Sequence, residues 1–188
     1  MHRIIANILF AFLIIAIITI ISLPFLLLSK RKGKDLIRQF SYIALFCSFF
    51  LILFATIFIT LPITFQPEQY VINVHPFLWL REEDVARQLF GEVIPNILLF
   101  IPLGLFLPIV FEKLRKLHQT GIVVFLITFS IEMLQFFIGR LSDIDDLTTN
   151  LLGGLLGYGI FKVSNHFFSK KRWWKRSIGN ELEDAGGK

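Results

Sequence analysis

A carboxylate inside an apolar run is the first residue of this sequence that could do chemistry. Glu132 lies among Ile, Met, Leu and Phe residues, and an ionised group at membrane depth costs on the order of a few kcal/mol unless it is paired, hydrated or protonated. A short polar stretch follows it in the chain and contains Arg140, Asp143, Asp145 and Asp146. Glu132 is therefore a candidate general acid or base, and the aspartates could supply a second carboxyl group or oxygen ligands for a divalent cation.

Amide side chains extend this polar set. Gln135 shares one helical face with Thr128 and Glu132, because the three follow i, i+4, i+7 spacing. Asn96 and Asn150 lie near the starts of two other apolar runs, each about 5 Å inside at 1.5 Å per residue. We expect these polar groups to meet at one end of a helical bundle. The candidate ligand-binding residues are Asn96, Glu132, Gln135, Arg140, Asp143, Asp145, Asp146 and Asn150.

Several of these residues also have a purely structural interpretation. Asn96 and Asn150 could hydrogen-bond across helices, as polar residues in membrane bundles do. Arg140 could pair with an aspartate at an exposed turn. Gly153 and Gly157 form a GxxxG pair, which indicates close helix packing rather than chemistry.

Metal and cofactor motifs are weak in this sequence. The SDIDD run that holds Asp143, Asp145 and Asp146 lacks the spacing and central glycine of a calcium loop, although these aspartates are the only candidate metal ligands. The sequence has no HExxH, GxSxG or phosphate-binding glycine loop. We therefore expect no resident cofactor, with a divalent cation as the open alternative.

The elements that must position these residues are long apolar runs. Of the 188 residues, 55% are apolar and 18% are charged, and the mean hydropathy is +0.70, which suits lipid better than water as the solvent. About 20 apolar residues cross a bilayer as a helix. The sequence thus predicts an all-α, polytopic membrane bundle of five transmembrane helices. The predicted spans are residues 4–28, 40–62, 93–111, 121–138 and 147–161.

The distribution of Lys and Arg predicts the orientation. Of the 19 basic residues, Arg3, Arg81, Arg87 and Arg140 fall on one side and the other fifteen on the opposite side. The positive-inside rule then places the N-terminus outside and the C-terminus in the cytoplasm of a multi-pass plasma-membrane protein. A cleaved signal peptide is the alternative for residues 4–28, but that run is longer than a signal peptide needs and lacks a small-x-small site.

This topology divides the chain into three parts. We expect an N-terminal helical hairpin at 1–62, a core with an extracytoplasmic loop and three spans at 63–162, and a basic cytoplasmic tail at 163–188. Basic residues around Trp173 and Trp174 favour anionic lipid headgroups rather than nucleic acid. The single cysteine, Cys47, lies in an apolar run and allows no internal disulfide.

Residues 73–160 resemble the VanZ-like family of small bacterial membrane proteins. The resemblance rests on NVHPF (73–77), NILLFIPLG (96–104), and SIEMLQ followed by GR, DIDD and NLLGGLLG (130–157). It implies an association with resistance of Gram-positive bacteria to lipoglycopeptides such as teicoplanin, through the cell envelope and without an established reaction.

Three hypotheses about function remain open. The leading hypothesis is a non-transporting protein whose outer-leaflet pocket binds an envelope lipid, a cell-wall precursor or a lipoglycopeptide. The second is an intramembrane enzyme on a lipid-linked substrate, with Glu132 as its catalytic candidate. The third is a structural or regulatory partner of another membrane protein, docking through the GxxxG face.

Overall fold

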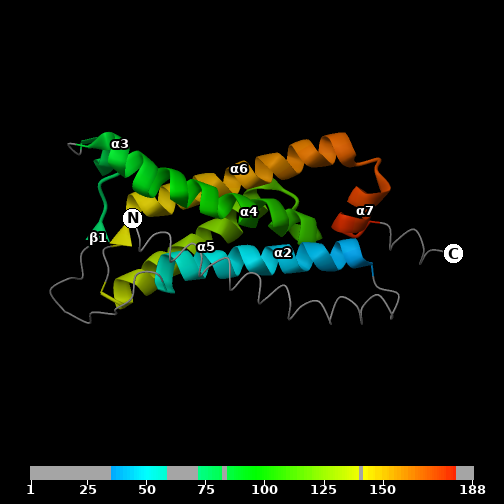
Figure 1. Cartoon of the computed structure of the whole chain (residues 1–188), viewed down its shortest axis with the longest axis horizontal. Coiled ribbons are helices and arrows are strands. Elements are labelled where there is room, and N and C mark those ends of the chain that lie inside the picture. The colour runs from blue at the N-terminus through cyan, green and yellow to red at the C-terminus, as the bar shows by residue number, and fades with distance from the viewer. Residues whose placement is uncertain (1–34, 59–71, 82–83, 140–141, 181–188) are drawn as a thin grey trace.

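Four long helices run side by side along the long axis of the molecule (Figure 1). The computed structural model describes residues 35–58, 72–81, 84–139 and 142–180. The predicted span 4–28 and the candidate Arg140 lie outside these residues. The long helices are α2 (Leu36–Leu53), α4 (Ile94–Val110), α5 (Leu117–Phe137) and α6 (Ile144–Phe168).

Three described helices are long and apolar enough to cross a membrane. They are Leu36–Ile57, Val85–Val110 and Leu117–Phe137, which confirms helices at the second, third and fourth predicted spans. The first of them ends in a π-helical segment, Phe54–Phe58. The second includes the short α3 (Val85–Gln88) and a π-helical segment, Leu89–Val93, that leads into α4. Short 3₁₀ turns at Leu78–Arg81 and Glu112–Leu114 complete the helical elements.

Helix α6 begins earlier than the sequence predicted. The sequence predicted a polar turn over residues 140–146 before the span at 147–161, but α6 already begins at Ile144 and its first turn contains Asp145 and Asp146. Asp143 caps this start, accepting a 2.9 Å hydrogen bond from the backbone N–H of Asp145. Negative charge in the first turn also suits the positive end of the helix dipole. Two aspartates expected in a turn are thus held on a helix.

Helix α6 packs most extensively against α4, and next against α5. Glycines allow the approach to α4: a Cβ added to Gly153 or Gly157 would overlap the backbone carbonyl of Ile97 or Ile101. A Cβ on Gly104 of α4 would likewise overlap the backbone of Gly154. The GxxxG face is therefore covered by a helix of the same chain. A buried apolar cluster of α2, α4 and α5 lies beside this contact and contains Ile52, Phe100, Leu103, Leu107, Val124 and Ile131.

A short C-terminal helix, α7 (Arg172–Ile178), folds back against the bundle. Trp174 and Ile178 are buried with Phe161, Tyr158 and Ile109. The indole Nε1 of Trp174 donates to Oδ1 of Asn165 at 2.9 Å. The sequence predicted only a basic tail here and gave no sign of this packing.

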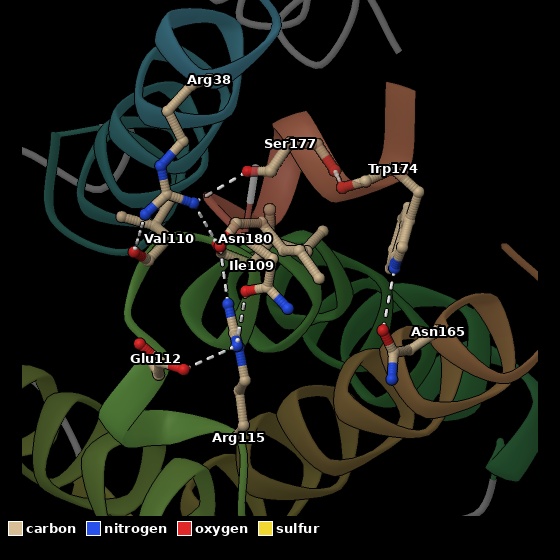
Figure 2. A network of polar contacts seen from close by, with 10 residues as sticks. Arg38, Ile109, Val110, Glu112, Arg115, Asn165, Trp174, Ser177 and Asn180 are labelled. Atoms are coloured by element: carbon tan, nitrogen blue, oxygen red, sulfur yellow. Dashed lines mark hydrogen bonds and ion pairs between the residues drawn. The ribbon is translucent and has the colours of Figure 1, made fainter. Parts of the chain in front are cut away.

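Two arginines at this end of the bundle donate hydrogen bonds to backbone carbonyls at the ends of helices (Figure 2). Arg38 donates to the backbone carbonyls of Ile109, Val110 and Ser177 at 2.6, 2.7 and 2.8 Å. Arg115 donates to the carbonyl of Ile178 at 2.6 Å. These carbonyls lie at the C-terminal ends of α4 and α7, where they have no partner within their own helix. The guanidinium groups therefore complete hydrogen bonding where helices end and suit the negative end of each helix dipole.

Candidate functional site

Four helices enclose a pocket at the opposite end of the bundle. Its volume is about 260 Å³. The lining comes from the end of the α2 segment and from α4, α5 and α6, and includes five of the eight predicted ligand-binding residues. The described lining residues are Ala55, Thr56, Pro95, Asn96, Leu99, Glu132, Gln135, Asp146 and Asn150.

Glu132 is buried in the last third of α5, where only 5% of its surface is exposed. Its Oε2 accepts a 3.1 Å hydrogen bond from the backbone N–H of Asp143 and a 3.2 Å bond from the hydroxyl of Ser142. Both donors are neutral and both come from the segment that leads into α6. Glu132 thus ties the end of α5 to the start of α6 with one oxygen, while its side chain lines the pocket.

Two amides link the walls of the pocket. Asn96 of α4 donates from Nδ2 to Oδ1 of Asp146 on α6 at 2.7 Å. Gln135 of α5 donates from Nε2 to the backbone carbonyl of Thr56 at 2.9 Å. Each bond joins helices that are distant in sequence, so hydrogen bonds between helices hold the walls of the pocket together.

Asn150 supplies a third bond between helices and one unsatisfied atom. Its Nδ2 donates to the hydroxyl of Thr128 on α5 at 3.0 Å. Its Oδ1 is buried and has no hydrogen-bond partner in the described part of the chain, although the residue is only 2% exposed. Asn96 and Asn150 therefore both bond across helices, as their structural interpretation predicted. An unpaired buried amide oxygen costs about 1–3 kcal/mol, so Asn150 needs a further explanation.

Asp143 and Asp145 face the segment in front of α3. Nδ2 of Asn73 donates to both carboxylate oxygens of Asp143 at 3.1 Å, and the backbone N–H of Phe77 donates to Asp145 at 2.6 Å. The two-residue strands β1 (Ile72–Asn73) and β2 (Ser142–Asp143) pair in parallel beside these bonds. This small sheet is an exception to the expected all-α fold.

A family model described as VanZ/LLP1 matches residues 8–165, which is most of the chain. The chain belongs to the VanZ/LLP1 family. It is also 33% identical over 141 residues to Protein VanZ of Enterococcus faecium, covering 74% of this chain and 82% of that protein. No solved structure matches the chain.

The segments that suggested a VanZ-like protein contribute directly to this end of the fold. The NVHPF segment contains Asn73 and Phe77, which Asp143 and Asp145 hold. Phe77 has a left-handed backbone with φ 61°, which is uncommon for a bulky residue. Hydrogen bonds through Asp143 and Asp145 therefore connect residues of the NVHPF, SIEMLQ and DIDD segments in this VanZ/LLP1 chain.

The predicted metal ligands of this VanZ/LLP1 chain do not converge. Within residues 35–58, 72–81, 84–139 and 142–180, no three His, Cys, Asp or Glu side chains are placed to hold a metal ion. Asp143 and Asp145 accept hydrogen bonds from the chain itself, and Asp146 accepts one from Asn96. The arrangement is that of a hydrogen-bonded polar pocket.

Sequence reasoning missed the contribution of the second span to the pocket. Ala55 and Thr56 line it, and the Thr56 carbonyl receives the Gln135 amide. Both lie in the π-helical segment Phe54–Phe58, and π-helical turns occur frequently at functional sites. The sequence carries no signal for such a turn in an uncharged apolar run.

Proposed function

We propose that this chain is a multi-pass protein of the bacterial cell membrane whose outer-leaflet pocket binds an envelope amphiphile or a lipoglycopeptide. By this proposal, it contributes to glycopeptide resistance of the teicoplanin type, which membership of the VanZ/LLP1 family suggests. The main observation behind this proposal is the pocket of about 260 Å³ between four helices, three of which line it with carboxylate and amide side chains. The unpartnered, buried Oδ1 of Asn150 supports a ligand at this position.

The charge at the two ends of the bundle supports the proposed orientation. The pocket end holds Glu132 and Asp146, whereas Arg38, Arg115 and Arg176 lie at the α7 end. Basic residues accumulate on the cytoplasmic side of membrane proteins. The α7 end is then cytoplasmic and the pocket opens toward the envelope, in a topology of five spans that includes residues 4–28.

An amphiphilic ligand suits the surroundings of the pocket. Apolar side chains close to it in sequence remain exposed, with 59% of Leu98, 48% of Leu134 and 60% of Phe137 accessible. Such side chains are compatible with contact to lipid tails. A ligand could therefore keep an acyl chain in the bilayer while its head group enters the pocket.

An intramembrane enzyme is the second candidate, because Glu132 and Asp146 line the same pocket and paired carboxyl groups can share acid and base roles. Glu132→Gln would then abolish turnover of a lipid-linked substrate and leave its affinity largely intact. If Glu132→Gln instead loses both ligand binding and resistance, the result would support a protein that binds its ligand without converting it. Docking of a partner through the GxxxG face is disfavoured, since α4 of the same chain covers Gly153 and Gly157.

The test is growth inhibition by teicoplanin and by vancomycin in a susceptible Gram-positive host. Wild type, Glu132→Gln and Ser130→Ala are expressed at matched membrane levels. Ser130 is a suitable control, because it is exposed on the same helix and its hydroxyl bonds only within α5. We expect protection by wild type and Ser130→Ala, stronger against teicoplanin, and its loss in Glu132→Gln. Equal protection by all three would reject the pocket as the functional site.

A further inference from the structure

Three amide side chains of the pocket each donate a hydrogen bond to another part of the protein. Nδ2 of Asn96 is bonded to the Asp146 carboxylate and Nε2 of Gln135 to a backbone carbonyl. Both partners accept hydrogen bonds, so the orientation of these two amides follows from chemistry. Nδ2 of Asn150 is bonded to Thr128. Each of these amides therefore uses one of its two N–H donors within the protein.

Hydrogen-bond acceptors remain. Oδ1 of Asn150 is buried without a partner in the described chain. Within the same described residues, Oε1 of Glu132 and the amide oxygens of Asn96 and Gln135 receive no hydrogen bond, while Oε2 of Glu132 receives two. All four residues line the pocket. A molecule that satisfies them must bring several N–H or O–H donors.

The charge of the pocket favours a cation. Glu132 is 5% exposed and its hydrogen-bond donors are the neutral Ser142 hydroxyl and a backbone N–H. Within the described residues, Glu132 lines the pocket and forms no ion pair with a Lys, Arg or His side chain. A carboxylate at membrane depth is costly unless a positive group or water accompanies it.

We propose that the pocket takes the primary ammonium group of an amphiphile, with Glu132 as its counter-charge and the amide oxygens of Asn150, Asn96 and Gln135 as acceptors. The proposal rests on the proposed function, which makes this pocket a ligand site. An ammonium group carries three N–H donors. A quaternary ammonium has none and is typically held by aromatic rings, which are absent from the described lining. A phosphate would be repelled by the negative charge of Glu132, which lines the pocket.

The experiment compares ligands that differ only in their head group. Binding of decylamine, N-decylacetamide, decyltrimethylammonium and decyl phosphate to the purified full-length chain in a neutral detergent is measured by calorimetry, with empty micelles as the blank. We expect decylamine to bind at least about tenfold more tightly than the other three, because only it offers charge-assisted N–H donors. Equal binding of the amine and its acetamide, or tighter binding of decyl phosphate, would overturn the proposal.

Two variants test whether the selectivity for the ammonium head group comes from the pocket. Glu132→Gln keeps the shape and an acceptor oxygen, and is expected to remove about tenfold or more of the decylamine affinity, whereas Ser130→Ala should leave it unchanged. An unchanged affinity in folded Glu132→Gln would overturn the proposal. If that variant does not fold, the head-group selectivity of the wild type decides the question.

Two further arms identify the source of the amine. Native mass spectrometry of the chain in nanodiscs tests retention of phosphatidylethanolamine over phosphatidylglycerol, and calorimetry tests a wall pentapeptide with a free lysine amine against its Nε-acetylated form. Preference for the amine in the first arm indicates a lipid head group, and in the second a wall peptide. Absence of preference in both arms overturns the proposal. The ammonium ligand and the proposed function can fail separately. If Glu132→Gln loses teicoplanin protection but the wild type binds decyl phosphate more tightly than decylamine, the ammonium ligand is rejected and the proposed function is kept.

Discussion

Asn96 of α4 donates a 2.7 Å hydrogen bond to Asp146 of α6 and so joins two walls of the pocket. Replacing Asn96 with Leu removes this donor from a half-buried carboxylate. We expect a loss of about 1–3 kcal/mol in stability, seen as a lower thermal midpoint of the purified protein. Ser130→Ala, whose hydroxyl bonds within its own helix, should keep the wild-type midpoint. An unchanged midpoint in Asn96→Leu would show that this bond contributes little.

The contact between α4 and α6 predicts different effects for two glycines of one helix. A Cβ on Gly157 would overlap the carbonyl of Ile101, while one on Gly159 would meet nothing within 4 Å. Gly157→Ala should cost about 1–3 kcal/mol through overpacking. Gly159→Ala should be neutral or slightly stabilising, since alanine favours helix more than glycine does. Thermal unfolding of both variants tests this, and equal midpoints would contradict the observed approach of the helices.

Arg38 should control the docking of α7. Arg38→Lys keeps the positive charge, but loses the guanidinium that reaches the carbonyls of Ile109, Val110 and Ser177. We expect α7 to detach more often, with faster tryptic cleavage in this helix and an emission shift from the buried Trp174. The matched control is Arg87→Lys, at an exposed residue of α3. Equal cleavage rates in the two variants would count against the role of Arg38.

The proposed orientation can be tested with single cysteines. In a Cys47→Ser background, His75→Cys lies beside the pocket end and Lys116→Cys lies at the α7 end, and both positions are exposed. A membrane-impermeant maleimide on intact cells should label position 75 alone, because the pocket end is proposed to face outward. Labelling of position 116 alone would reverse the topology and place the pocket in the cytoplasm.

Much of the pocket followed from local patterns in the sequence. Thr128, Glu132 and Gln135 were expected on one inward face, and all three are buried on α5. Helical periodicity is a local property, so spacing alone identifies such a face. Arg140 lies outside the described residues, and its expected role in binding stays a prediction.

Composition, spacing and motifs are read along the chain, and they were enough to predict the apolar helices, the buried polar face of α5 and the family. Three contacts became visible only in the folded chain: the Gln135 amide with the Thr56 carbonyl, Asn73 with Asp143, and Arg38 with the C-terminal end of α7. These contacts join residues about 70 or more positions apart. They depend on how each helix is rotated and shifted against its neighbours, which side-chain packing fixes and local hydropathy does not record.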